Sequence, residues 1–241
     1  MFFLLSGEGV SDMGSGKGKA GVNEADDFLP GPMAVIVDQV VDTRLKYSMF
    51  DASCCGFVSE VDVASRAGEL KAAKKKLRLP GKRQAKETRY FFNTARVLSR
   101  IASDEAKQRE DDVIAVLFRD SDGTASAGRG LWEDKWQSIT DGFDEEEFTR
   151  GVPMVPKPKS EAWLICALKK TAYQNCMALE DRSGNDNSPK SLKKELAAIL
   201  GKEITPELLC EEVRNKLNIN KIKMSSFKAF RDRLEAVIDA E

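Results

Sequence analysis

The sequence predicts an α/β protein built on a mainly parallel, Rossmann-like sheet that is flanked by helices. Residues 1–5 and 113–118 are continuous apolar runs, which are typical of strands covered on both faces, as in parallel sheets. Helical spacings of apolar residues separate the expected strands, which indicates strand–helix–strand units. We therefore expect an α/β domain over residues 1–178, with a helical insertion at about 65–110, and a helical region over residues 179–241 packed on it.

The expected elements of the first half follow from local patterns. The apolar run of residues 1–5 predicts the first strand, and the glycines and lysines of residues 14–21 indicate a flexible basic loop. A Pro-Gly-Pro sequence then favours a helix start, and valines at helical spacing extend that helix over residues 33–47. Alternation over residues 56–63 predicts a strand, and apolar residues along one side predict a long helix over residues 88–107.

The second half contains the clearest strand, residues 113–118, because every residue in it is apolar. Apolar periodicity predicts a helix over residues 131–148, and a short strand is expected at residues 151–155. Ser160 is placed to cap a helix over residues 162–173. Proline-led starts and apolar spacing predict further helices at residues 189–200, from residue 205 and at residues 225–239.

The composition restricts the chemistry of any active site. The chain has 241 residues, of which 41% are hydrophobic and 32% charged, so it can build a core. Its formal charge of −1 restricts any nucleic-acid surface to a local patch. It contains no histidine, which excludes His–Cys zinc sites, nucleases with a histidine base and Ser-His-Asp hydrolases. A metal site must therefore use oxygen ligands, which favours Mg²⁺, Mn²⁺ or Ca²⁺ and not zinc.

The cysteines and the N-terminus indicate the expected compartment. No Cys-x-x-Cys pair is present and the number of cysteines is odd, so we expect buried reduced thiols rather than a disulfide framework. The apolar run at the N-terminus is too short for a signal peptide or a membrane span. We therefore expect a cytoplasmic protein with no membrane partner. The cysteines are Cys54, Cys55, Cys166, Cys176 and Cys210.

Three acidic residues follow the two most apolar strands. Glu8 lies just past the first strand, and Asp120 and Asp122 lie just past residues 113–118. Ligand sites of open α/β sheets form outside the carboxyl ends of the strands, so these carboxylates converge if the two strands are neighbours. Side chains at positions i and i+2 share a side, which lets Asp120 and Asp122 face one cation. Mg²⁺ commonly binds one or two carboxylates together with substrate phosphate.

Residues 4–9, Leu-Leu-Ser-Gly-Glu-Gly, and residues 116–123, Val-Leu-Phe-Arg-Asp-Ser-Asp-Gly, resemble the two signature motifs of the TOPRIM fold. This fold occurs in topoisomerases, bacterial primases, recombination proteins and nucleases of the OLD type (overcoming lysogenization defect). The resemblance implies a nuclease that cleaves DNA or RNA with Mg²⁺ or Mn²⁺, in phage defence and with a regulatory protein partner from the same operon. It gives Glu8 the general acid/base place and makes Glu8, Asp120 and Asp122 the expected metal-binding set.

Residues 152–164 are similar to a strand followed by Glu-Ala-Trp-Leu in small stand-alone TOPRIM-like proteins of bacterial defence operons. That similarity makes Glu161 a further acidic residue of the metal site. Basic residues next to these motifs are the expected phosphate contacts, since Arg and Lys bind phosphate oxygens. They are Arg119, Lys157 and Lys159.

Residues 71–86 are strongly basic and allow two interpretations. They form either a solvated helix face with a loop or a patch that contacts the phosphate backbone of a nucleic acid. The second interpretation makes nucleic acid a partner of this segment. The expected contacts are then Lys74, Lys75, Lys76, Arg78, Lys82 and Arg83.

Two alternative functions stay open. Residues 120–124, Asp-Ser-Asp-Gly-Thr, match the first motif of haloacid-dehalogenase-type phosphatases, in which Asp120 is the nucleophile and Asp122 the acid/base. That motif usually opens its domain, whereas here it comes late in the α/β region. The other alternative is a catalytically silent TOPRIM-like binding or regulatory module, which the presence of all the acidic residues disfavours. Residues 14–18, Gly-Ser-Gly-Lys-Gly, do not form a P-loop, which needs Gly-Lys followed by Ser or Thr.

Overall fold

The computed structural model describes residues 1–18, 20–73, 88–121, 131–169, 175–201 and 204–240. Its main sheet has five strands in the order β3-β5-β1-β6-β7. All pairings in this sheet are parallel except that of β3 with β5, so the expected mainly parallel α/β sheet is confirmed. The strands are β1 (Phe2–Gly7), β3 (Val22–Glu24), β5 (Cys55–Ser59), β6 (Val113–Phe118) and β7 (Gly151–Met154).

The two central strands are buried along their whole length. Every residue of β1 and of β6 is buried. Phe3 and Leu5 point into one core, whereas Phe2 and Leu4 point into the other, as the two-residue period of a strand requires. Burying each of these side chains contributes about 1.5–3 kcal/mol, which explains why continuous apolar runs occupy the centre of the sheet.

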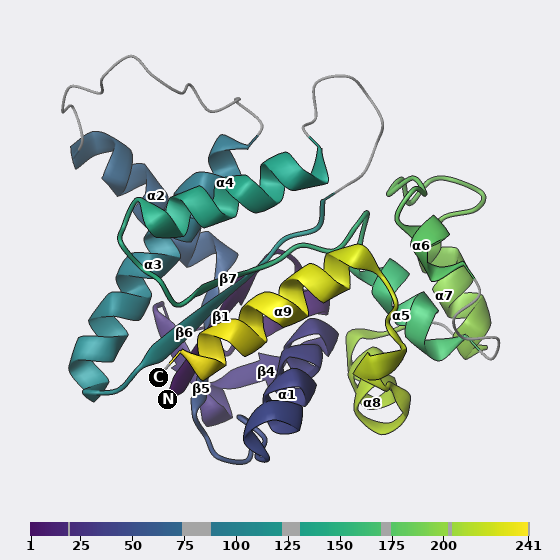
Figure 1. The fold of residues 1–241 in the computed structure, drawn as a ribbon, viewed down its shortest axis with the longest axis horizontal. Coiled ribbons are helices and arrows are strands. Elements are labelled where there is room, and N and C mark those ends of the chain that lie inside the picture. Colours follow the sequence, from purple (N-terminus) through teal and green to yellow (C-terminus); the bar gives the residue numbers. More distant parts are fainter. Residues whose placement is uncertain (19, 74–87, 122–130, 170–174, 202–203, 241) are drawn as a thin grey trace.

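Helices cover both faces of the sheet. On the Phe2 face lie α2 (Glu60–Ala73), α3 (Arg89–Arg109) and α4 (Trp132–Asp144). On the Phe3 face lie α1 (Pro32–Leu45), α5 (Ser160–Leu168) and the C-terminal helices. Figure 1 shows α3 and α4 together on one side of the sheet and α1 and α9 on the other. The prediction of a sheet flanked by helices therefore holds on both faces.

The helices after β7 share a core with the sheet. Leu196, Val213 and Phe230 belong to the same buried cluster as Phe3 of β1. Trp163 of α5 anchors this contact, because its ring stacks on Phe230 at 5.9 Å and its Nε1 donates a hydrogen bond to Ser226 Oγ at 2.9 Å. The helices are α6 (Cys176–Leu179), α7 (Leu192–Leu200), α8 (Pro206–Lys216) and α9 (Ser225–Asp239), with a 3₁₀ turn, η3, at Ile219–Lys221.

Two segments differ in detail from the sequence-based expectation. The helices α2 and α3, expected within an insertion, form the crossover that leads from β5 to β6 on the other side of β1. The basic loop expected at residues 14–21 begins with β2 (Gly14–Gly16), which pairs with β4 (Phe28–Pro30). Gly14 has φ +119° and its backbone lies so near the Leu29 carbonyl that a Cβ would be 2.3 Å from that oxygen. Only glycine fits there.

The cysteines contradict the expectation that all of them are reduced thiols. Cys166 of α5 and Cys176 of α6 form a disulfide, with their Cα atoms 5.3 Å apart. Cys54, Cys55 and Cys210 are free. Burial raises the pKa of Cys55 to about 12 and that of Cys210 to about 11, so neither thiol is a ready nucleophile. Among the described residues, no helix has the length and apolar character needed to cross a bilayer.

Candidate functional site

The site begins where β1 and β6 end side by side. Gly7 of β1 is level with Phe118 of β6, so the next residues of both strands leave the sheet at one edge. There the backbone N–H of Asp120 donates a hydrogen bond of 2.6 Å to Glu8 Oε1. The two strands are neighbours, which is the condition under which the sequence predicted that Glu8 and Asp120 converge.

Asp120 is held between β6 and the start of α5. Its Oδ1 accepts a hydrogen bond of 3.0 Å from the backbone N–H of Ser160. The pKa of Asp120 lies well above its usual range, first because the carboxyl is buried and then because Asp12, Glu161 and Glu8 place negative charge around it. Asp120 is therefore the centre of a group of like charges.

Asp12 is a member of this group that the sequence analysis did not select. It lies in η1 (Gly9–Met13), the helical turn that follows Glu8. Ser160 Oγ donates a hydrogen bond of 2.6 Å to Asp12 Oδ1, and Ser11 Oγ donates one of 3.3 Å to Oδ2. Burial raises the pKa of Asp12, although these hydrogen bonds oppose the shift. The signal that could have revealed it is its position one helical turn after Glu8 at the carboxyl end of β1.

Glu161, the second residue of α5, contributes a buried carboxylate oxygen, Oε2, without a hydrogen-bond partner among the described residues. Burial raises its pKa, and the charge of Asp12 raises it further. A buried carboxylate oxygen without a partner is costly unless a ligand satisfies it. We call Glu8, Asp12, Asp120 and Glu161 the carboxylate cluster.

The carboxylate cluster fits a hard divalent cation in donor type and in charge. Its donors are oxygens, and one of these oxygens has no hydrogen-bond partner among the described residues. Three of its members have raised pKa values, which a bound cation would lower. Within the residues that the structure describes, however, no group of three or more His, Cys, Asp or Glu side chains is arranged so that it could hold a metal ion. Asp122, an expected ligand, lies outside the described residues.

The loop before α5 is tied to the end of β6. The Ser121 backbone N–H donates to the Pro156 carbonyl at 3.2 Å, and its Oγ donates to the Pro158 carbonyl at 3.2 Å. This places Lys159, an expected phosphate contact, beside the cluster, where the charges of Glu161 and Asp120 help to raise its pKa. Lys159 Nζ donates to Asp186 Oδ2 at 3.1 Å, and Lys157 is partly exposed in the same loop.

Arg119 lies in the interior, which favours a positioning role over the expected phosphate contact. Its side chain is 2% exposed. Its Nη1 lies 2.7 Å from Glu60 Oε1 and 3.2 Å from Glu8 Oε2, and its Nη2 donates to the Tyr90 hydroxyl at 3.0 Å. The guanidinium carbon also lies 4.6 Å from the centre of the Tyr90 ring. Arg119 therefore fixes the orientation of Glu8.

Glu60 and Tyr90 are the other residues that sequence reasoning missed. Glu60 follows β5 at the same edge of the sheet, and Tyr90 opens α3. Burial opposes ionisation of Glu60, but hydrogen bonds from Tyr90 and Arg119 outweigh it and lower its pKa. A carboxylate just after a parallel strand was the available signal for Glu60, whereas nothing local marked Tyr90.

The basic residues expected to contact nucleic acid cannot be placed. Lys74, Lys75, Lys76, Arg78, Lys82 and Arg83 lie outside the described residues. The segment that contains them joins α2, which begins at Glu60, to α3, which contains Tyr90. Both flanking helices therefore contact Arg119 at the site through these two residues.

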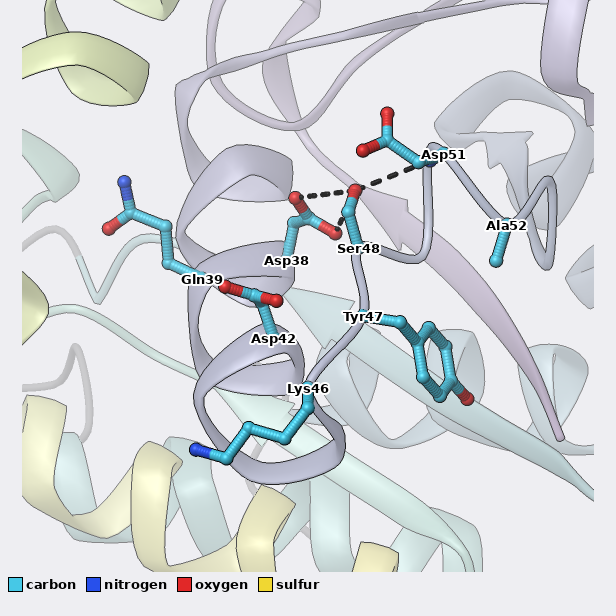
Figure 2. A pocket seen from close by; sticks show the side chains of 8 residues that line it. All are labelled: Asp38, Gln39, Asp42, Lys46, Tyr47, Ser48, Asp51 and Ala52. Carbon is cyan, nitrogen blue, oxygen red and sulfur yellow. Dashed lines mark hydrogen bonds between the residues drawn. The ribbon is translucent and has the colours of Figure 1, made fainter.

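A separate depression of about 580 Å³ lies at the opposite edge of the sheet, where α1 ends and the chain enters β5. Figure 2 shows Asp38 pointing at Ser48 there, with Lys46 and Tyr47 directed away from it. Asp38 accepts hydrogen bonds from Ser48 Oγ and from the backbone N–H of Met49. Asp38 is thus occupied in holding the turn before β5, and the depression shares no residue with the carboxylate cluster.

Comparisons of this chain with protein-family models, with curated proteins and with solved structures find no match.

Proposed function

We propose that this protein is a metal-dependent nuclease of the TOPRIM type, which hydrolyses phosphodiester bonds of DNA or RNA with Mg²⁺ or Mn²⁺. The observation that carries the proposal is the contact between Glu8 and Asp120 at the ends of adjacent parallel strands, with Asp12 and Glu161 around them. Such an edge is where α/β sheets place their ligand sites. The proposed setting is phage defence in the cytoplasm, under a regulatory protein partner.

The carboxylates divide into a metal-binding part and a proton-transfer part. Asp120, Asp12 and Glu161, together with Asp122, would hold the ion through oxygen ligands. When bound, a divalent cation at this place stabilises charge on phosphoryl oxygens and lowers the pKa of a water molecule. Ser160 orients two of the proposed ligands, because its backbone N–H holds Asp120 and its hydroxyl holds Asp12.

Glu8 is the proposed proton-transfer residue. Its side chain is 34% exposed, so water reaches it, while Arg119 and the Asp120 N–H fix both carboxylate oxygens. A general base must be held within hydrogen-bond reach of the proton that it takes, and these two contacts provide that orientation. The exposed side of Glu8 is where an attacking water would lose its proton.

The contact between Glu8 and Asp120 also favours the nuclease over the phosphatase alternative. In the phosphatase mechanism Asp120 attacks phosphorus itself and Glu8 has no role. In this structure Glu8 is bound to the Asp120 backbone and to Arg119, an arrangement that the phosphatase mechanism leaves unexplained.

Glu8→Gln tests the proposal. Proton-transfer groups contribute about 10²–10⁴-fold, so this variant should lose at least about a hundredfold in nucleic-acid cleavage with Mg²⁺ or Mn²⁺. Glu133→Gln is the matched control, because Glu133 is exposed in the first turn of α4. Both variants are assayed on single-stranded and duplex DNA and RNA and on a phosphate monoester. Undiminished monoester turnover by Glu8→Gln, with phosphate trapped on Asp120, would establish the phosphatase instead.

A further inference from the structure

A pocket of about 250 Å³ adjoins the carboxylate cluster on the side of the C-terminal helices. Asp12 and Glu161 line it on one side, together with the hydroxyl-bearing Ser11 and Ser160. Leu196 of α7 and Leu209 of α8 line it on the other. The proposed metal ligands and an apolar wall therefore face the same pocket, which is partly open to solvent.

The apolar wall comes from two helices that otherwise pack into the core. Leu196 and Leu209 are buried, and Ile204 and Pro206 extend the wall towards solvent. Lys193, in the first turn of α7, is exposed, and its charge reaches Asp12 across the pocket. The pocket thus has an acidic side, an aliphatic side and one cation.

We propose that this pocket receives one unpaired nucleobase of the substrate strand, next to the phosphate that is cleaved. The proposal rests on the proposed nuclease function and names its substrate: a single-stranded or locally unpaired nucleic acid. A base stacked inside a duplex cannot enter a side pocket, so the nucleotide must be unpaired or turned out of the helix.

The size and chemistry of the pocket fit a base better than they fit other parts of a nucleotide. Pockets for drug-sized ligands span about 300–1,000 Å³, so a smaller one of about 250 Å³ suits a single planar group. The leucines offer apolar contact to the face of a ring, whereas a charged phosphate gains nothing from an apolar wall. The hydroxyls of Ser11 and Ser160 donate to Asp12 and can still accept hydrogen bonds from a base edge.

Filling the pocket provides the test. Ile204→Trp places a large ring on the apolar wall, and Ile199→Trp is the matched control, since Ile199 is also partly buried, lies on α7 and does not line the pocket. The substrates are a single-stranded oligonucleotide and the same strand with abasic tetrahydrofuran residues around the cleavage site. Thermal melting of each variant establishes that it is folded.

Wild-type protein and Ile199→Trp should cleave the normal strand at least about tenfold faster than the abasic strand, since apolar pockets discriminate by about 10- to 200-fold. Ile204→Trp should cleave both strands at the slower, abasic rate. Equal cleavage of the two strands by the wild type would refute the pocket while leaving the proposed nuclease intact. Faster cleavage of duplex than of single strands would also refute it.

A binding measurement separates failure of the pocket from failure of the nuclease. A strand that contains 2-aminopurine is bound in the presence of Ca²⁺, and its fluorescence should rise when the base leaves its stacked neighbours. The rise should be lost in Ile204→Trp and kept in Ile199→Trp. If the wild type cleaves nothing with Mg²⁺ or Mn²⁺, the proposed nuclease function is refuted. The fluorescence signal alone then tests whether the pocket binds a base. Equal fluorescence changes in both variants would overturn it.

Discussion

Asp120→Asn should make the metal-free protein more stable and should remove its stabilisation by Mg²⁺. The pKa of Asp120 is raised by burial and by the charges of Asp12, Glu161 and Glu8. Its ionised form therefore destabilises the fold at neutral pH. Asparagine keeps the oxygen that accepts the hydrogen bond from the Ser160 N–H and removes the charge.

The size of the effect follows from linkage. If folding raises a carboxyl pKa by one pH unit, the ionised carboxyl costs about 1.4 kcal/mol of stability at a pH above both the folded and the unfolded pKa. For a chain of this length, 1 kcal/mol changes the melting temperature by about 2–4 °C. The metal-free variant should therefore melt above the wild type, by about 3–6 °C for each tenfold by which folding weakens the acidity of the carboxyl that is replaced. Wild-type protein should gain about 2.7 kcal/mol from Mg²⁺ at a hundred times its Kd, and the variant should gain almost nothing.

The assay is differential scanning calorimetry at pH 7, with EDTA and then with increasing MgCl₂. Asp51→Asn is the matched control, because Asp51 is exposed at the opposite edge of the sheet, beside the depression shown in Figure 2. Its melting temperature should match that of the wild type and should rise equally with Mg²⁺. The reasoning fails if metal-free Asp120→Asn melts below the wild type, or if Mg²⁺ stabilises both proteins to the same extent.

Three further predictions concern pH, Arg119 and the basic segment. Because folding raises the pKa of Asp120, the stability that its protonated form contributes is full below about pH 4 and is lost as pH rises through the raised pKa. The melting advantage of Asp120→Asn should therefore grow from about pH 4 to about pH 7, and a constant advantage would contradict this. Arg119→Met should cost about 1–3 kcal/mol in urea unfolding, less than for a fully buried pair because Glu8 and Glu60 are partly exposed, and a cost near zero would refute the pairing. Replacing four basic residues by Gln should reduce the slope of log affinity against log salt on duplex DNA by about 0.9 for each lost contact, and an unchanged slope would indicate a solvated face; the four are Lys74, Lys75, Arg78 and Lys82.

The central strands of the sheet were predictable because each contains a continuous run of apolar residues. Residues 113–118 are apolar at every position and form β6 over the same range. The pairing of β1 with β6 could not be predicted from local patterns, because strand order depends on contacts between segments far apart in the chain. The strand β2 was missed because its Gly-Ser-Gly sequence carries no apolar pattern, and β4 was missed because three residues are too few to show a strand period.

The site was predictable only in part, for the same reason. Glu8 and Asp120 were found because each follows an apolar strand directly. Asp12 could have been found from its position one helical turn after Glu8, whereas Tyr90 acts through a contact with Arg119 that no spacing in the sequence reveals. The disulfide was missed similarly, because Cys166 and Cys176 lie 10 residues apart and do not form a Cys-x-x-Cys motif.

The distribution of positive charge explains why the carboxylates take different roles. Arg119 lies 3.2 Å from Glu8, so Glu8 already has a counter-charge. The buried Asp120 is surrounded instead by the negative charges of Asp12, Glu161 and Glu8, and its pKa is raised. Repulsion within that group is costly without a cation, whereas Glu8 can exchange a proton beside a fixed guanidinium. Moving the arginine from Glu8 to Asp120 would reverse these roles, since the metal would then compete with a permanent positive charge for its central ligand.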